Sequence, residues 1–200
     1  MKLSDNLIQP DKRIAFFKGF LARPGQVGSL IPSSRFLERR ICDLANIESA
    51  KTIVELGPGT GGTTRAMLRC MPTDGLILTI EIDPKFYRII SAIADPRLIA
   101  HQGCAGDLRD IVLSYGIDSV DAVISGIPFS IIRPEFGRSI IQSISDLLSR
   151  DGRFVAYQFR DRVNVLGREV LGPSRVHLEL FNIPPVRVYS WSKNGHLQAD

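Results

Sequence analysis

A glycine-rich turn carries the clearest chemical signal in this sequence of 200 residues. A short apolar strand ends near Glu55, and the loop Gly57–Gly61 follows it and opens a helical pattern. Glycines let the backbone turn sharply and let a ligand approach the backbone amides, because no Cβ stands in the way. Gly57, Gly59 and Gly62 also fit the G-x-G-x-x-G pattern, so the loop alone allows either a nicotinamide dinucleotide or S-adenosylmethionine.

Two carboxylates separate these ligands. Glu55 stands two residues before the first glycine, where it would repel a pyrophosphate bound at the helix N-terminus. S-adenosylmethionine has no phosphate, and its ammonium and sulfonium groups both suit a nearby carboxylate. Glu81 ends the next strand, where a carboxylate can accept hydrogen bonds from both ribose hydroxyls of either ligand. Glu55 therefore favours S-adenosylmethionine. The candidate cofactor-binding residues are Glu55, Gly57, Pro58, Gly59, Thr60, Gly61, Glu81, Ile82, Cys104, Ala105 and Ser125.

The loop His101–Asp107, after the third strand, departs from the usual adenine contact. Many methyltransferases have an aspartate after the glycine at this point, and it accepts from the adenine amino group. This chain has Cys104 there, which is a poor hydrogen-bond acceptor. The backbone amides of Cys104 and Ala105 could bind adenine, or Asp107 could reach in. Asp107 is also placed to cap the following helix.

The loop Ser125–Phe129 follows the fourth strand, beside the expected position of the methyl donor. Methyltransferases that act on adenine amines carry an Asn- or Asp-Pro-Pro-Tyr-like motif here, whose amide or carboxylate accepts from the target amine. This chain keeps a proline and an aromatic residue but has Ser125 in place of the amide. An aliphatic amine, which becomes cationic on methylation, needs an aromatic wall more than an amide. Phe129 fits that use, and ordinary packing of the loop is the alternative.

From residue 52 onward, short β-rich runs alternate with helical patterns. The predicted strands are Thr52–Leu56, Leu76–Glu81, Leu98–His101, Ala122–Ser125, Arg153–Phe159, Val176–Phe181 and Val186–Trp191. The predicted helices are Thr63–Cys70, Lys85–Ala94, Leu108–Tyr115 and Pro134–Ser149. This alternation predicts an α/β fold with a Rossmann-like, mostly parallel sheet covered by helices on both faces. Asn182–Pro185 is too short for a crossover helix, so the last two strands should form an antiparallel hairpin.

The first 50 residues differ from the rest in charge and pattern. Residues 1–40 carry eight basic and three acidic side chains, whereas the remaining 160 carry 17 and 18. A predicted helix from Asp11 to about Ala22 gathers three phenylalanines, an isoleucine and a leucine on one side. A basic amphipathic helix of this kind suits an anionic membrane surface, and the alternative is a helix packed on the domain or closing the pocket as a lid.

A second helix follows in the same segment. A serine of Pro32–Ser34 can cap it, and it should run to about Ala45. We therefore divide the chain at residue 50, into an N-terminal helical segment (1–50) and a cofactor-binding domain (51–200).

The composition excludes several classes of protein. With 44% hydrophobic and 23% charged residues, the chain is neither a disordered tail, a coiled coil nor a collagen-like repeat. It has no apolar stretch that could span a bilayer and no signal-peptide pattern at its start. Three separated cysteines and three scattered histidines predict reduced thiols and no metal centre. We expect a cytoplasmic protein on the inner face of the membrane, and the near-neutral globule disfavours a nucleic-acid partner.

With these residues in hand, the sequence resembles bacterial phospholipid N-methyltransferases, the soluble class that is similar to rRNA adenine dimethylases. The resemblance runs from about Phe16 to Trp191. Its most specific parts are the block Phe16–Leu21 and the Asn-Ile-Pro-Pro block at 182–185. The glycine loop is shared by many unrelated methyltransferases.

The resemblance implies the seven-stranded sheet of class I S-adenosylmethionine-dependent methyltransferases and N-methylation of the amino head group of phosphatidylethanolamine. Tyr157 and Tyr189 are then candidates to orient the head group, Arg187 to pair with its phosphate, and Phe129 to face the amine. The alternative for the first three is a structural role, with Arg187 as an ordinary surface residue of its strand. The alternatives are methylation of a small molecule or another amino lipid, and rRNA adenine dimethylation. Ser125 and the near-neutral globule disfavour the last of these.

Overall fold

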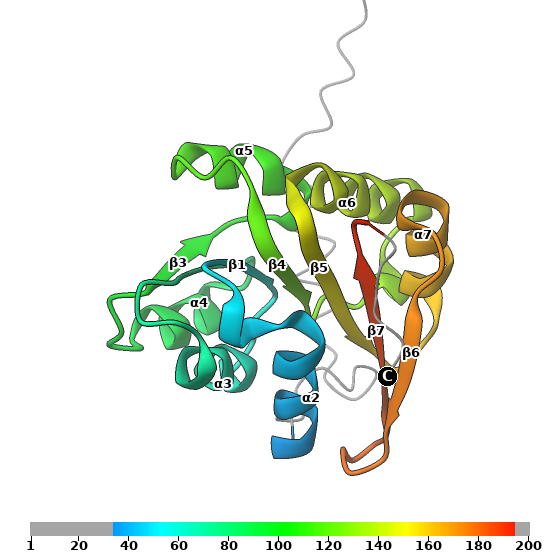
Figure 1. Cartoon of the computed structure of the whole chain (residues 1–200), viewed down its shortest axis with the longest axis horizontal. Coiled ribbons are helices and arrows are strands. Elements are labelled where there is room, and N and C mark those ends of the chain that lie inside the picture. The colour runs from blue at the N-terminus through cyan, green and yellow to red at the C-terminus, as the bar shows by residue number, and fades with distance from the viewer. Residues whose placement is uncertain (1–33, 195–200) are drawn as a thin grey trace, which may run out of the picture.

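Seven strands form one sheet in the order β3-β2-β1-β4-β5-β7-β6 (Figure 1). The strands are β1 (Thr52–Leu56), β2 (Leu76–Glu81), β3 (Leu98–Gln102), β4 (Val120–Ser125), β5 (Leu148–Gln158), β6 (Arg175–Glu179) and β7 (Val186–Ser192). Neighbouring strands are parallel except at β7, which runs antiparallel to both β5 and β6. The predicted sheet and its C-terminal antiparallel hairpin are confirmed, with β7 inserted between β5 and β6.

The computed structural model describes residues 34–194, so the predicted helix between Asp11 and Ala22 lies outside the described residues. Helices cover both faces of the sheet (Figure 1). They are α2 (Arg35–Ala45), α3 (Gly62–Cys70), α4 (Pro84–Ser91), α5 (Leu108–Ser114), α6 (Pro134–Leu147) and α7 (Arg162–Leu171). Short 3-10 turns lie at Ile47–Ser49, Ala105–Asp107 and Phe129–Ile131. The core under α2 and α3 is separate from the core under α5, α6 and α7.

The second predicted helix is confirmed as α2. Ser34 is its N-cap, because the Ser34 side chain accepts a hydrogen bond from the amide of Leu37, which satisfies one of the otherwise unpaired first-turn donors. Leu37 and Ile41 are buried one turn apart in the core that α2 shares with α3 and the sheet. Residues 35–45 therefore pack on the sheet, and the division at residue 50 stays a prediction.

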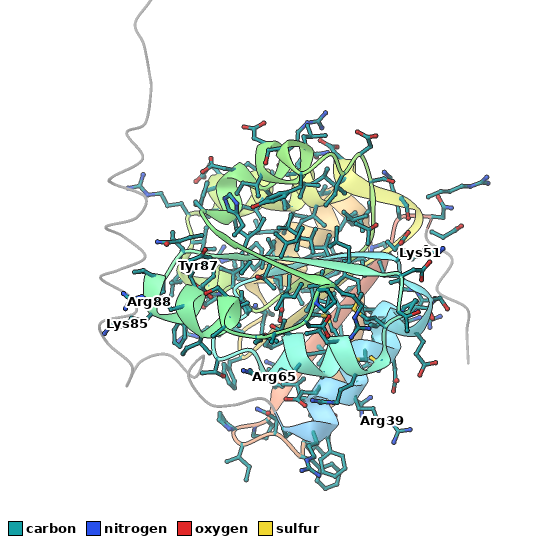
Figure 2. All side chains as sticks on the ribbon, turned by 90° about the vertical axis from the view of Figure 1, so that its left-hand side faces the viewer. Arg39, Lys51, Arg65, Lys85, Tyr87 and Arg88 are labelled. Atoms are coloured by element: carbon teal, nitrogen blue, oxygen red, sulfur yellow. The ribbon has the colours of Figure 1, made fainter. Side chains whose placement is uncertain are left out.

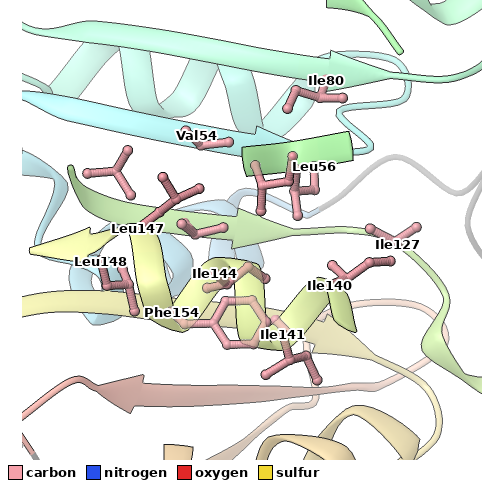
Figure 3. Close-up of a cluster of buried hydrophobic side chains, with 14 of the residues drawn as sticks. Val54, Leu56, Ile80, Ile127, Ile140, Ile141, Ile144, Leu147, Leu148 and Phe154 are labelled. Carbon is pink, nitrogen blue, oxygen red and sulfur yellow. The ribbon is translucent and has the colours of Figure 1, made fainter. Parts of the chain in front are cut away.

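The larger core holds the parallel strands in place. Figure 3 shows Val54 and Ile80 from neighbouring strands in one cluster with Ile140 and Ile144 of α6 and Phe154 of β5. All five side chains are at most 2% exposed. Full burial of each such side chain stabilises the fold by about 1.5–3 kcal/mol. The carboxyl ends of the parallel strands, where the candidate ligand-binding residues lie, are thus fixed by packing behind them.

One helix was not predicted from the sequence. The interval between β5 and β6 forms α7, whose buried residues are Val163, Leu166 and Gly167. Val163, Leu166 and Val170 recur with helical spacing, which is the signal that could have found the helix. Gly167 weakens the pattern because glycine is a poor helix former. The structure explains why glycine stands at this position, since a Cβ at Gly167 would collide with the indole ring of Trp191.

Candidate functional site

The loop after β1 needs glycine for its shape. Gly57, Gly59 and Gly61 have φ angles of 69°, 55° and 81°, in the left-handed region that side chains with a Cβ seldom adopt. Gly61 is also the N-cap of α3, so the loop turns directly into the helix. Pro58 within it is buried and Thr60 is exposed. The amides of the three glycines donate to the carbonyl of Ile80, the carboxylate of Glu81 and the carbonyl of Pro58, which fixes the loop at the carboxyl end of β1.

Glu81 lies beside this loop. It ends β2, is 5% exposed, and accepts hydrogen bonds from the amide of Gly59 at 3.1 Å and from that of Asp83 at 2.9 Å. Burial raises the pKa of Glu81, and the two amide donors act against that rise. Its neighbour Ile82 is half-buried and packs against the larger core. The carboxylate is therefore held at the point where ribose hydroxyls would have to bind.

Glu55 is a buried carboxylate with an unused oxygen. The residue is fully buried, and its Oε2 accepts from the hydroxyl of Thr64 at 2.6 Å. Its Oε1 has no hydrogen-bond partner within residues 34–194. Burial raises the pKa of Glu55 to about 8, with Glu81 adding to the rise and Thr64 opposing it. A buried acceptor without a partner costs free energy unless a ligand fills it. A cationic ammonium fits that oxygen.

The loop after β3 also lies at this edge. The amide of Gly103 donates to the carbonyl of Glu81 at 3.0 Å, which ties the two loops together. The sulfur of Cys104 accepts from the amide of Gly106 at 3.4 Å, and the turn beginning at Ala105 follows. Asp107 occupies the N-cap position of α5, but in the described chain its side chain makes no capping hydrogen bond. Asp107 therefore stands at the predicted N-cap position, but within residues 34–194 the predicted hydrogen bond between its side chain and the helix is absent.

The loop after β4 packs directly on the glycine loop. The amide of Gly126 donates to the carbonyl of Leu56 at 2.9 Å, and a Cβ on Gly57 would lie 3.6 Å from the amide of Ile127. Ser125 is buried, and its hydroxyl accepts from the amide of Ile127 at 3.3 Å. Ser125 thus fixes the start of this loop through its own side chain.

Gln158 is a positioning residue that the sequence analysis did not select. It lies at the end of β5, is buried, donates to the carbonyl of Ile127 at 2.6 Å, and accepts from the amide of Phe129 at 3.3 Å. It therefore holds two backbone groups of the loop after β4 at once. A lone glutamine directly after the apolar run Phe154–Tyr157 is the signal that could have identified it.

The position of Phe129 differs from the prediction. Phe129 is 0% exposed and belongs to the larger core. Its ring packs next to Gly137 of α6, where a Cβ on the glycine would touch it. The alternative of ordinary loop packing therefore describes Phe129 in this structure. The physical reason is the Phe129–Ile131 turn, which is held by Gln158 and directs the ring into the core rather than toward the strand ends.

Tyr157 lies where β1, β4 and β5 end. A Cβ on Gly126 would come within 2.5 Å of the Tyr157 hydroxyl, so glycine is needed for the two to pack. Burial raises the pKa of the Tyr157 phenol above its usual range, and the nearby Glu55 adds to that rise, while a hydrogen bond with Thr63 opposes it. The phenol therefore stays protonated and can act as a hydrogen-bond donor close to Glu55.

Arg187 and Tyr189 face a different space. Both line a cavity of about 470 Å³ between β7 and α7, together with Phe159, Arg160, Asp161, Asn164 and Val176. The Arg187 guanidinium donates to the carbonyl of Phe159 at 3.1 Å. The Tyr189 ring is 1% exposed, and its hydroxyl has no partner among the described residues. Arg187 and Tyr189 therefore line one cavity, whereas Tyr157 lies apart from it, beside the glycine loop.

The described part of the chain contains neither a candidate membrane span nor a candidate metal site. Between residues 34 and 194, no helix is both long and apolar enough to cross a bilayer. No three His, Cys, Asp or Glu side chains in that range are grouped in a way that could hold a metal ion.

Comparison with known proteins identifies relatives of the sequence and of the fold. No family model matches the chain. It is 30% identical over 141 residues to the ornithine lipid N-methyltransferase of Singulisphaera acidiphila, which covers 70% of this chain and 73% of that protein. It is 29% identical over 93 residues to the ribosomal RNA small subunit methyltransferase A of Caulobacter vibrioides, covering 46% of this chain but 35% of that protein.

A solved structure shares the architecture. The O-methyltransferase TomG of Streptomyces achromogenes, in complex with S-adenosylmethionine, superposes with a TM-score of 0.65 at 18% identity, covering 94% of this chain and 92% of that one. This likeness confirms the predicted Rossmann-like methyltransferase fold.

Proposed function

The chain belongs to the S-adenosylmethionine-dependent methyltransferases, in the family of the ornithine lipid N-methyltransferase, and we propose that it methylates the amine of a membrane amino lipid. The observation that carries this proposal is the match to that lipid enzyme over more than two thirds of both chains. The ribosomal RNA relatives match over a much smaller share of their length.

The proposal extends to the head group. Phosphatidylethanolamine and an ornithine head group both combine an amine with an anionic group, a phosphate or a carboxylate. Arg187 and Arg160 line one cavity at the carboxyl edge of the sheet, beside the unpartnered hydroxyl of Tyr189 within the described chain. Guanidinium groups bind phosphates and carboxylates through charge-assisted hydrogen bonds. We propose phosphatidylethanolamine as the first substrate to test and an ornithine lipid as the second.

The residues around the glycine loop fit the cofactor. Glu81 would accept from the ribose hydroxyls, and the unused Oε1 of Glu55 would face the ammonium of the methionine moiety. The backbone of the glycine loop, Gly57–Gly61, and of Cys104 and Ala105 would contact the rest of the molecule. When bound, S-adenosylmethionine supplies an electrophilic methyl group on its sulfonium.

The protein has to position the amine and keep it unprotonated. A site that excludes water favours the neutral amine, because burial disfavours the charged form. Gln158 holds the loop after β4 in one shape through Ile127 and Phe129. The protonated Tyr157 phenol can donate a hydrogen bond at this edge. Chemistry of this kind depends mainly on proximity and orientation.

The test is methyl transfer with methyl-labelled S-adenosylmethionine. The acceptors, offered separately, are anionic vesicles with phosphatidylethanolamine, the same vesicles with an ornithine lipid, small ribosomal subunits, and phosphoethanolamine in solution. We expect label in the organic extract of one or both lipid samples. Label confined to RNA or to the soluble amine would overturn the proposal while leaving the methyltransferase assignment in place.

Proton release on cofactor binding tests the role of Glu55. Its pKa of about 8 means that the carboxyl is mostly protonated at pH 7 in the free protein. Pairing with the cofactor ammonium would lower that pKa, so binding should release nearly one proton. Calorimetric titration at pH 7, in buffers with different ionisation enthalpies, counts the protons released.

Stability should change with pH for the same reason. The folded-state pKa of Glu55 is raised above its ordinary value of 4.5 to about 8, so between these values the folded state binds more protons than the unfolded state. The free energy of unfolding should then fall as pH rises through this window. Glu55→Gln should abolish this contribution and the proton release, whereas the exposed Glu48→Gln should preserve both. Equal proton release from Glu55→Gln and wild type would contradict the assignment.

A further inference from the structure

The connection between β6 and β7 presents large apolar side chains to solvent. Ile183 is 82% exposed and Phe181 is 69% exposed. Leu178, Leu180 and Phe36 of α2 are each more than half exposed. The rings of Phe36 and Phe181 lie 4.9 Å apart, which joins the hairpin to α2. We call these five residues the tip patch; contiguous exposed apolar surface of this kind marks an interaction site.

Buried polar contacts hold the tip patch in this arrangement. The Asn182 side chain is 4% exposed, accepts from the amide of Ser34 at 3.1 Å and donates to the carbonyl of Pro184 at 2.9 Å. Glu179 is 2% exposed, accepts from the amide of Phe181 at 3.1 Å and pairs with Arg40 at 2.7 Å. At the connection, Glu179 and Asn182 are therefore buried whereas Leu180, Phe181 and Ile183 are exposed, the reverse of an ordinary water-facing turn.

The tip patch lies at the same edge of the sheet as the candidate site. β6 is antiparallel to β7 and therefore runs in the direction of β5. Arg187 is paired with both Leu178 and Gln158, so the hairpin begins level with the end of β5. Figure 1 shows the hairpin connection and the start of α2 extending together past the ends of the parallel strands. A surface that contacts the tip patch therefore lies next to the carboxyl edge of the sheet, where the candidate site is.

The charges around the tip patch indicate which kind of surface it can bind. Residues 180–186 carry no charge, and Glu179 is neutralised by Arg40. Arg35 and Arg39 are exposed on α2, next to Phe36, and Arg187 is exposed at the start of β7. Figure 2 shows Arg39 extending away from α2 into solvent, where its side chain is 86% exposed. Exposed apolar side chains beside arginines match the interface of an anionic bilayer.

We propose that the tip patch inserts into the interface of an anionic lipid bilayer and thereby sets the candidate site against the lipid head groups. A projecting tip enters a soft interface, whereas a groove would be needed to receive a peptide helix. The inference rests on the proposed function for its biological meaning, but the membrane contact is measured without any methyl transfer.

The test compares two triple variants of the full chain. The tip variant is Leu180→Ser, Phe181→Ser and Ile183→Ser. The matched control is Ile89→Ser, Leu113→Ser and Val165→Ser, which removes exposed apolar side chains from α4, α5 and α7. Binding is measured by co-sedimentation with phosphatidylcholine vesicles, with and without phosphatidylglycerol. We expect the tip variant to bind the anionic vesicles at least ~10-fold more weakly than wild type, because the affinity scales with buried apolar area. The control should bind like wild type.

Further readings separate this inference from the proposed function. Circular dichroism and S-adenosylmethionine binding should be unchanged in the tip variant, which shows that it folds and keeps its cofactor site. Methylation of lipid dispersed in detergent should survive in the tip variant, and its absence in wild type and variant alike would count against the proposed function only. Wild-type vesicle binding by the tip variant would overturn the inference. A change from dimer to monomer with unchanged vesicle binding would overturn it in favour of a second copy of the chain.

Discussion

Glu81→Ala is expected to weaken S-adenosylmethionine binding by at least about 100-fold, because hydrogen bonds to a charged acceptor contribute roughly 1.5–3 kcal/mol each and two ribose hydroxyls lose theirs. The substitution also removes the acceptor of the Gly59 and Asp83 amides. The glycine loop and the start of α4 thereby lose a shared anchor. Isothermal calorimetry measures the dissociation constant, and methyl transfer should fall in parallel at cofactor concentrations below the new constant.

Two further variants make the Glu81 result specific. Glu81→Gln keeps one acceptor oxygen, so its affinity should lie between those of wild type and Glu81→Ala. Glu48→Gln should bind like wild type, because Glu48 is exposed and precedes the amino end of β1, whereas the candidate site lies at the carboxyl ends of the strands. The assigned role of this carboxylate would be wrong if Glu81→Ala bound the cofactor with wild-type affinity while circular dichroism showed that it is folded.

Trp191→Ala is expected to lower the free energy of unfolding by about 3–5 kcal/mol, the range for removing a large buried aromatic side chain. The ring is 1% exposed, lies 5.0 Å from the ring of Phe154 between centroids, and donates from Nε1 to the carbonyl of Gly172 at 3.1 Å. It also fills the space beside Gly167 of α7. The substitution would therefore leave a cavity between α7 and the sheet.

Urea denaturation followed by circular dichroism is the suitable measurement, because Trp191 is the single tryptophan of the chain and its fluorescence is lost in the variant. Trp191→Phe keeps an aromatic ring and should cost much less. Val165→Ala, at an exposed position of α7, should be nearly neutral. A loss below about 1 kcal/mol for Trp191→Ala would show that this part of the core repacks freely.

The strands and the two carboxylates were accessible from the sequence for local reasons. Continuous apolar runs bounded by turn residues mark buried parallel strands, and the carboxyl end of each such strand is where a ligand binds. Glu55 and Glu81 stand at two of these ends, and the structure places both beside the glycine loop. Ser34 was likewise predictable as a cap, because a serine before an amphipathic stretch satisfies first-turn amides.

Other features depended on partners far away in the chain. α7 was missed because Gly167 interrupts its pattern, and its reason is the Trp191 ring, which comes from β7. β5 begins at Leu148 instead of Arg153, because Leu148 pairs with Val120 ahead of a bulge. Phe129 was assigned to the substrate, but its turn is fixed by Gln158 of another strand.

The class of fold, the cofactor and the edge of the sheet that holds the candidate site could all be predicted from the amino-acid sequence. Those conclusions rest on residue types at short spacing, and short spacing is enough to define a strand end or a glycine turn. Which side chains meet depends on the tertiary packing of the chain. This packing inserted β7 between β5 and β6, placed Arg187 and Tyr189 over a cavity apart from Tyr157, and turned the apolar side chains of the β6–β7 connection outward. Strand neighbours and burial are set by the packing of the whole chain, so no local pattern contains them.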